Sequence, residues 1–191
     1  MIKTGIFGGS FNPIHNGHIS LARQLKEKAG LDEVWLMVSP QNPMKQQTDL
    51  LSDEIRLQMA RMALEHETGI VASDYEIHLP KPSYTWFTLQ ALSCDYPDRQ
   101  FVLMIGGDNW AIFDRWYHAD DILQNYQLVV YPRRDALMKN EVLPASVMMV
   151  EAELLDVSST EVRQRIHEGR SIQELVPPSV AAFIKQEGLY V

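Results

Sequence analysis

Cysteine is almost absent from this sequence, which has a single one, Cys94, among 191 residues. A lone thiol can form neither an internal disulfide nor a cysteine-based zinc site, so the chain is not a disulfide-stabilised scaffold. Long apolar runs are missing too, and no charged-then-apolar leader opens the chain. From these features we expect a cytoplasmic protein with no membrane partner.

Positive charge is scarce, because 17 lysines and arginines stand against 25 acidic residues and the formal net charge is −8. Proteins that bind nucleic acids or anionic membranes rely on basic patches, so we expect no nucleic-acid partner. A polyphosphate ligand would instead need positive charge gathered locally. The candidates for that local charge are Lys45, Arg133, Arg134 and Arg163.

Hydrophobic residues are plentiful at 46% of the chain, which is enough to bury a core. Short apolar runs at 33–38, 100–105 and 127–131 alternate with helical patterns such as 18–29 and 83–96. This alternation predicts an α/β fold, a Rossmann-like doubly wound parallel sheet with helices on both faces. Ligands are expected at the carboxyl ends of its strands.

The length of the chain suits one domain, because domains run to about 100–200 residues. We therefore expect a single domain over 1–191, with a small C-terminal helical portion at about 157–191. Two local patterns give further predictions. Residues 75–79 alternate as an extended segment does, and Ser171 with Glu174 fits a capping box at a helix start.

The most informative stretch is residues 5–20, GIFGGSFNPIHNGHIS. An apolar run ends at Gly8-Gly9, a tight turn follows at Asn12-Pro13, and His15 and His18 open a helical segment. Glycines let a backbone approach a ligand closely, and the first turn of a helix offers N–H groups and partial positive charge to an anion. Histidines three residues apart point the same way there, so the pattern predicts that both imidazoles bind phosphate.

Other nucleotide and metal motifs do not fit this stretch. It lacks the G-x-G-x-x-G spacing of dinucleotide-binding proteins and the G-K-[ST] end of a P-loop. Neither H-E-x-x-H nor a cysteine cluster accompanies the histidines, so metal ligation by them ranks low. The plain alternative is a glycine turn followed by ordinary surface or core histidines.

Two later segments repeat the arrangement of a loop before a helix. Gly106-Gly107-Asp108 follows the run 100–105, and Asp108 suits a ribose hydroxyl, a magnesium shell or a helix cap. Ser158 with Glu161 fits a capping box, which predicts a helix that begins at Ser158 and can bind an anion. Arg163 follows within about one turn, in reach of phosphates gathered there. A plain capped surface helix is the alternative.

Taken in order, these motifs resemble those of a known family. GGSFNPIHNGH, at 8–18, is similar to the signature of the H-x-G-H nucleotidyltransferases, and its wording is closest to the bacterial nicotinate mononucleotide adenylyltransferases. The chain departs from them at Phe87, where many relatives have an aspartate. Further matches follow in the family's order: Ser83-Tyr84-Thr85, Gly106-Gly107-Asp108, Arg115-Trp116-Tyr117, and Val157-Ser158-Ser159-Thr160 with Arg163.

The resemblance implies an ATP-dependent adenylyltransferase that acts with Mg²⁺. It would transfer AMP from ATP to nicotinate mononucleotide in NAD biosynthesis, giving nicotinate adenine dinucleotide and pyrophosphate. The residues implied to be catalytic are His15, His18 and Arg163, with no metal ligand among the side chains. Those implied to hold the acceptor are Lys45, Tyr84, Thr85 and Trp116, the last against the pyridine ring. Those implied to hold ATP are Gly8, Gly9, Ser10, Phe11, Gly107, Asp108, Arg133, Ser158, Ser159 and Thr160.

A phosphate oxygen is already a competent nucleophile, so this transfer needs no general base. Alignment and charge stabilisation would supply the catalysis. Three alternatives stay open: transfer to nicotinamide mononucleotide or phosphopantetheine, a non-catalytic nucleotide-binding sensor, and a Rossmann-type oxidoreductase, the last weakened by the missing glycine spacing. A homo-oligomer is also compatible with the sequence.

Overall fold

The computed structural model describes residues 1–40, 50–132 and 143–191. Its strands form one six-stranded sheet in the order β3-β2-β1-β4-β5-β6, and every neighbouring pair is parallel. The strands are β1 (Ile2–Gly9), β2 (Glu33–Val38), β3 (Ile70–Ser73), β4 (Arg99–Gly106), β5 (Gln127–Tyr131) and β6 (Val147–Met149). This is the doubly wound order, in which the direction of winding reverses between β1 and β4.

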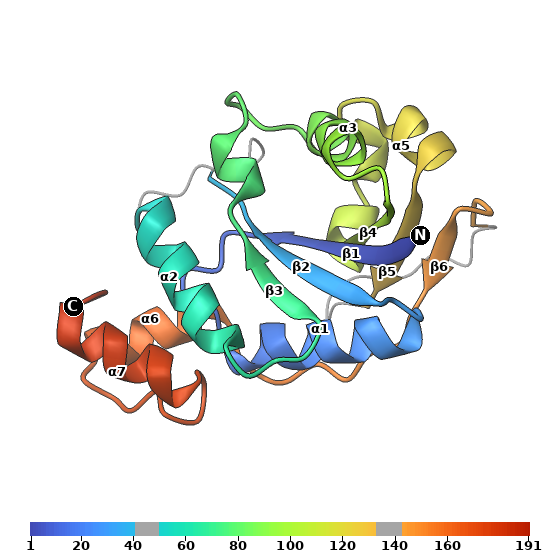
Figure 1. Cartoon of the computed structure of the whole chain (residues 1–191). Coiled ribbons are helices and arrows are strands. Elements are labelled where there is room, and N and C mark those ends of the chain that lie inside the picture. Colours follow the sequence, from blue (N-terminus) through green and yellow to red (C-terminus); the bar gives the residue numbers. More distant parts are fainter. Residues whose placement is uncertain (41–49, 133–142) are drawn as a thin grey trace.

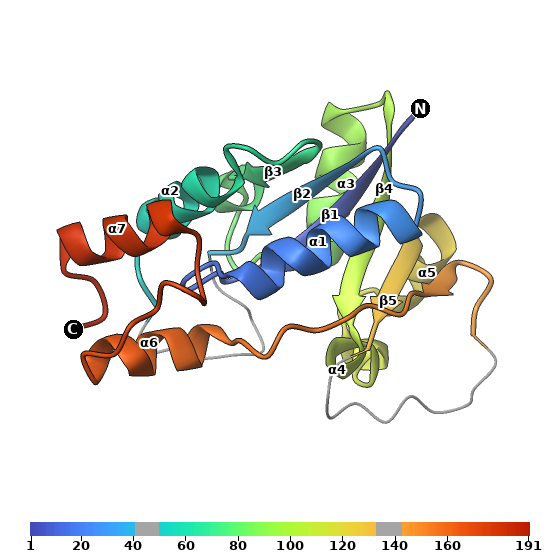
Figure 2. The same ribbon diagram turned by 90° about the horizontal axis from the view of Figure 1, so that it is seen from below.

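Helices cover both faces of the sheet (Figure 1). On one face lie α1 (Asn16–Lys28) and α2 (Asp53–Leu64), joined by α6 (Ser159–His167) and α7 (Pro178–Glu187). On the other lie α3 (Thr85–Asp95) and α5 (Ala119–Asn125). Figure 2 shows α6 and α7 together at the end of the molecule that carries the C-terminus. The predicted fold class, with its C-terminal helical portion, is confirmed.

Each central strand supplies both hydrophobic cores, because successive side chains of a strand point to opposite faces. In β2, Val34 and Leu36 belong to the core beneath α1 and α2, while Trp35 and Met37 belong to the core beneath α3 and α5. Burial on both faces explains why β2 reads as a continuous apolar run. The predicted ranges 33–38 and 127–131 match the observed strands, and β4 is one residue longer at each end than predicted.

Two local predictions were wrong. Residues 75–79 are not extended, because Tyr75–His78 forms a 3₁₀ helix, η1, in which Ile77 N–H donates to Asp74 O at 2.9 Å. The capping box at Ser171 and Glu174 starts no helix, since the Glu174 carboxylate pairs with Arg165 and α7 begins only at Pro178. A backbone hydrogen bond at residues 74–77 and an ion pair at Glu174 therefore take the place of the predicted contacts.

Helix α1 begins two residues before the predicted range 18–29, with His15 as its N-cap. Its apolar face carries Ile19, Leu21, Ala22 and Leu25 into the core, as its spacing predicts. None of the helices in the described ranges is long and apolar enough to cross a membrane.

Candidate active site

A cavity of 1510 Å³ opens at the carboxyl ends of the central strands, where the sheet changes its direction of winding. Gly8 and Gly9 at the end of β1 line it, as does Ile105 near the end of β4. Pockets for one drug-sized ligand are about 300–1,000 Å³. The cavity therefore has room for two nucleotides, at the place where doubly wound sheets bind ligands.

Several helices begin at the wall of this cavity. The starts of α1, α3 and α6 contribute His18, Thr85 and Ser159 to its lining. The first-turn N–H groups of a helix have no acceptor within that helix, and its dipole places partial positive charge at the same end. Three such ends facing one cavity favour anionic groups in it, although the whole chain is acidic.

The two histidines of the first motif stack on each other, with ring centroids 3.6 Å apart and planes at 22°. The backbone N–H of His15 donates to Nδ1 of His18 at 3.2 Å. Because Nδ1 accepts this bond, the ring proton of neutral His18 lies on Nε2, which is then a donor. Phe11 packs its ring edge against His18, with centroids 4.9 Å apart. The pair is therefore held in one orientation at the cavity wall.

Gly17, between the histidines, is needed for close packing. A Cβ atom there would lie 2.8 Å from Cγ1 of Val157 and 3.0 Å from Nδ1 of His15. Both distances are shorter than ordinary van der Waals contact. The glycine of the H-x-G-H motif thus lets the segment before α6 approach the histidine pair.

Helix α6 is attached directly to the loop of the first motif. Arg163 Nη1 donates to the Asn12 carbonyl at 2.8 Å, and Ser159 Oγ donates to the Pro13 carbonyl at 2.8 Å. The Ser158 side chain caps the helix by accepting from Glu161 N–H at 3.1 Å. The Glu161 carboxylate pairs with Arg165 at 2.7 Å. Segments about 150 residues apart in sequence thereby meet on one cavity.

Aromatic rings line the side of the cavity near α3. Trp116 follows the 3₁₀ helix η2 (Phe113–Arg115) and packs on Phe113 at 5.2 Å between centroids. Tyr84, the N-cap of α3, lies 4.9 Å from Tyr117. Trp110 also packs on Phe113, at 5.4 Å, and does not line the cavity. The rings of Trp116 and Tyr84 are therefore available to stack on a flat ring of a ligand.

Most of the predicted site residues lie on this cavity. Those that line it are Gly8, Gly9, Ser10, Phe11, His15, His18, Tyr84, Thr85, Asp108, Trp116, Ser158, Ser159, Thr160 and Arg163. Gly107 is buried at the start of α4 (Gly107–Trp110) and does not line it. Lys45, Arg133 and Arg134 lie outside the described residues.

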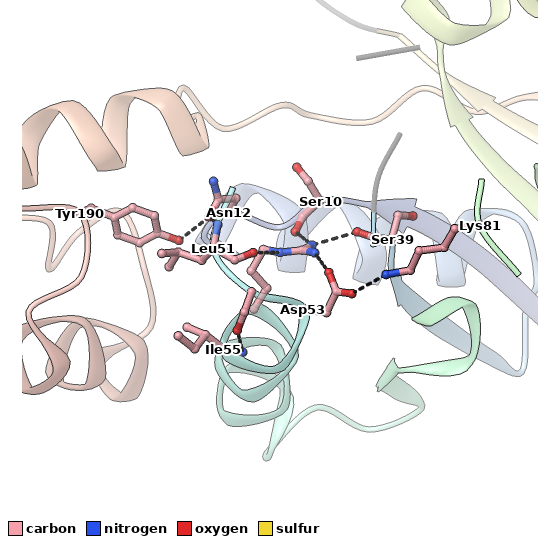
Figure 3. A network of polar contacts seen from close by, with 10 residues as sticks. Ser10, Asn12, Ser39, Leu51, Asp53, Ile55, Lys81 and Tyr190 are labelled. Atoms are coloured by element: carbon pink, nitrogen blue, oxygen red, sulfur yellow. Dashed lines mark hydrogen bonds and ion pairs between the residues drawn. The ribbon is translucent and has the colours of Figure 1, made fainter. Parts of the chain in front are cut away.

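The residue that sequence analysis missed most clearly is Arg56 of α2, whose side chain is 0% exposed. It donates to three backbone carbonyls, those of Ser10 at 2.6 Å, Ser39 at 2.9 Å and Leu51 at 2.9 Å, and it pairs with Asp53. Figure 3 shows these groups gathered around one point. Arg56 thus joins the loops that follow β1 and β2, both of which border the cavity. Burial lowers the pKa of its guanidinium, while Asp53 acts in the opposite direction.

Glu76 is a second residue that the sequence did not single out. It lines the cavity, is 7% exposed and accepts a hydrogen bond from Thr88 Oγ1 at 3.0 Å. Burial raises the pKa of its carboxyl, and hydrogen bonds from Ser39, Thr88 and Ser83 oppose that rise. The alternation of 75–79 predicts an extended segment and gives no sign that Glu76 is buried, whereas the 3₁₀ helix η1 places it in the cavity lining.

Glu76 gives a prediction about stability and pH. A carboxyl with a raised pKa in the folded state stabilises the fold fully below its unfolded pKa of about 4.3, and this contribution is lost as pH rises through the folded pKa. Glu76→Gln should therefore gain stability relative to wild type as pH rises from about 4.3. Urea unfolding from acid to neutral pH measures this. Glu65→Gln, at an exposed position, is the control, and a difference for Glu76→Gln that stays constant or falls would contradict the prediction.

Within the described residues, no group of three or more His, Cys, Asp or Glu side chains could hold a metal ion. Single carboxylates do line the cavity, among them those of Asp108 and Asp156. Mg²⁺ in nucleotide sites is usually held by one or two carboxylates together with substrate phosphates and water. The donor set fits a magnesium ion that arrives with ATP.

The parallel sheet, the histidine pair at its switch point and the helix starts around one cavity define a nucleotide-binding α/β protein. Its sequence from 6 to 165 matches the Cytidylyltransferase-like family. A "Probable nicotinate-nucleotide adenylyltransferase" of Bacteroides fragilis is 46% identical over 97% of this chain and 92% of its own length. A Flavobacterium johnsoniae protein with the same name is 40% identical over 99% of both chains. The chain belongs to the Cytidylyltransferase-like family and, within it, to the nicotinate-nucleotide adenylyltransferases.

Solved structures agree with this fold. The Plasmodium falciparum nicotinic acid mononucleotide adenylyltransferase complexed with NaAD has a TM-score of 0.83 at 18% identity, over 100% of this chain and 98% of its own. A putative nicotinate-nucleotide adenylyltransferase from Vibrio parahaemolyticus has a TM-score of 0.73 at 24% identity, over 100% and 96%. At these identities the likeness shows the fold.

Proposed function

We propose that this adenylyltransferase transfers AMP from ATP to nicotinate mononucleotide, releasing pyrophosphate and nicotinate adenine dinucleotide. One observation carries the proposal: the H-x-G-H histidines and the capped start of α6 with Arg163 line the same cavity. The names of the relatives at 46% and 40% identity support nicotinate nucleotide as the acceptor.

The cavity residues divide between the two ends of the triphosphate. His15 and His18 donate to phosphate oxygens as negative charge develops on them, with Nε2 of His18 as its donor. Arg163 and the N–H groups at the start of α6 hold the departing pyrophosphate. Asp108, a carboxylate of the cavity lining, would help to hold a Mg²⁺ ion that arrives with ATP, and the ion would neutralise phosphate charge. Lys45 and Arg133, which lie outside the described residues, are the further cations that the family resemblance assigns to these ligands.

The acceptor lies on the aromatic side of the cavity. Its pyridine ring stacks on Trp116, and Tyr84 and Thr85 at the start of α3 contact the rest of the nucleotide. Its phosphate then faces the α-phosphorus of ATP, so that one oxygen forms the new P–O bond while the bond to pyrophosphate breaks. Alignment of two bound reactants can supply a large share of the rate, and no side-chain base is needed.

Product identification tests the proposal. With ATP, Mg²⁺ and nicotinate mononucleotide, the protein should release pyrophosphate and nicotinate adenine dinucleotide in equal amounts. Parallel reactions contain nicotinamide mononucleotide or phosphopantetheine as acceptor. A higher kcat/KM with either of those would replace the proposed acceptor, and binding of ATP without any pyrophosphate release would indicate a sensor instead.

We place this reaction in the cytoplasm. Cys94 is an exposed free thiol, which a reducing compartment keeps reduced. The homo-oligomer that the sequence allows is tested by light scattering on the purified protein.

A further inference from the structure

The loop of the first motif is held at Asn12, which is 3% exposed. Its carbonyl accepts from Arg163 Nη1 at 2.8 Å. Its side-chain Oδ1 accepts from the Tyr190 hydroxyl at 2.7 Å and from Leu51 N–H at 3.4 Å. Asn12 therefore connects the penultimate residue of the chain to the arginine that faces the cavity.

The tail is built to bring Tyr190 to this position. Val180 and Ile184 of α7 are buried in the core, and the helix ends at Gly188 with φ +59°. Leu189 N–H then donates to Ile184 O at 3.0 Å, which turns the chain back. Tyr190 itself has φ +63°, a left-handed conformation that residues other than glycine rarely adopt. Such conformations persist where surrounding contacts impose them, and they gather at functional sites.

The Tyr190 hydroxyl keeps its proton at neutral pH and so remains a hydrogen-bond donor. Burial raises the pKa of its phenol, and the positive charges of Arg163 and Arg56 oppose the rise. Figure 3 shows the Tyr190 hydroxyl directed at Asn12, on the opposite side of the network from Lys81. The tail is thus tied to the motif loop by an oriented hydrogen bond as well as by apolar packing.

We infer that Tyr190 is a positioning residue for the phosphate site: its hydrogen bond fixes Asn12, and Asn12 fixes Arg163 against the cavity. The expected change in kcat rests on the proposed function. The expected change in pyrophosphate affinity rests on anion binding alone. Loss of the hydroxyl would leave the fold and the acceptor side of the cavity in place. It would loosen the carbonyl on which the Arg163 guanidinium is anchored.

Tyr190→Phe tests this by removing one oxygen atom. Loss of one hydrogen bond from a positioned group corresponds to a change of about 3- to 10-fold. We expect a fall of that size in kcat and in the affinity for inorganic pyrophosphate measured by calorimetry, with KM for nicotinate mononucleotide within about 2-fold. Tyr75→Phe is the matched control, because it removes a phenol that donates to Asp95 at 2.6 Å outside the cavity lining.

A double-mutant cycle separates positioning from general support of the fold. If Tyr190 acts through Arg163, Tyr190→Phe should cause no further loss of pyrophosphate affinity in an Arg163→Ala background. Additive losses, or a lower unfolding temperature with unchanged kcat and pyrophosphate affinity, would overturn the inference. So would undetectable pyrophosphate binding by the wild-type protein. Because binding is measured without turnover, failure of the proposed acceptor leaves this test intact.

Discussion

Replacement of His18 by alanine is expected to lower kcat by about 10²- to 10³-fold, the cost of losing one preorganised donor to a developing charge. The Nδ1 atom of His18 already accepts from His15 N–H at 3.2 Å, so its donor Nε2 is fixed before substrate binds. Steady-state pyrophosphate release measures the effect. The fold should persist, because His18 is only partly buried and its neighbours Phe11 and His15 remain.

His78→Ala is the matched control for this variant. His78 has a side chain that is 72% exposed and lies 3.6 Å from Asp74, outside the cavity lining. Its kcat should stay within about 2-fold of wild type, as for most surface changes. Turnover near the wild-type rate in His18→Ala, with a normal unfolding transition, would remove His18 from the mechanism.

Replacement of Arg56 by methionine is expected to destabilise the protein by about 3–5 kcal/mol, the range for removing one partner of a buried ion pair. The change leaves Asp53 without its buried partner, and the carbonyls of Ser10, Ser39 and Leu51 lose their donor. Since folded domains are stable by about 5–15 kcal/mol, much of the free energy of unfolding would be lost. Equilibrium unfolding in urea measures it.

Two further variants show whether the geometry of the guanidinium matters. Arg56→Lys keeps the charge, but one ammonium cannot reproduce the fork of donors, so we expect an intermediate loss. Arg61→Met is the control. Arg61 lies on the same helix, its side chain is 58% exposed, and its ion pair with Asp74 at 3.1 Å should contribute under about 1 kcal/mol. Equal losses in Arg56→Met and Arg61→Met would contradict the role assigned to the buried network.

The sheet was predictable because local sequence determines it. Runs such as 33–38 and 127–131 are apolar throughout, as strands covered on both faces must be, and they form β2 and β5 with the predicted bounds. Ser158 caps α6 as its capping box predicts, and Ser52, which directly precedes Asp53 and Glu54, caps α2 in the same way. At Tyr75–His78 the alternation predicts an extended segment, but the backbone forms a 3₁₀ helix closed by the bond from Ile77 N–H to Asp74 O, so local periodicity gave the wrong structure.

The contacts that hold the loops of the site in place were not predictable in the same way. The spacing of Ile55, Met59, Met62 and Ala63 predicts the apolar stripe of α2, and Arg56 is not part of that stripe. The structure buries Met59 as predicted and packs Ile55 and Ala63 partly against the core, but it also buries Arg56, together with Leu57, Ala60 and Leu64. The acceptors of Arg56 lie in loops up to 46 residues away, and the partner of Tyr190 is 178 residues away. Spacing within one element carries no information about such contacts.

A crystal structure with a non-hydrolysable ATP analogue tests most directly whether the two motifs serve one triphosphate. We expect phosphate oxygens within hydrogen-bonding distance of His18 Nε2, of the Arg163 guanidinium and of the N–H groups that begin α6. A triphosphate bound against only one of these motifs, or outside the cavity at the carboxyl ends of β1 and β4, would contradict the proposed mechanism.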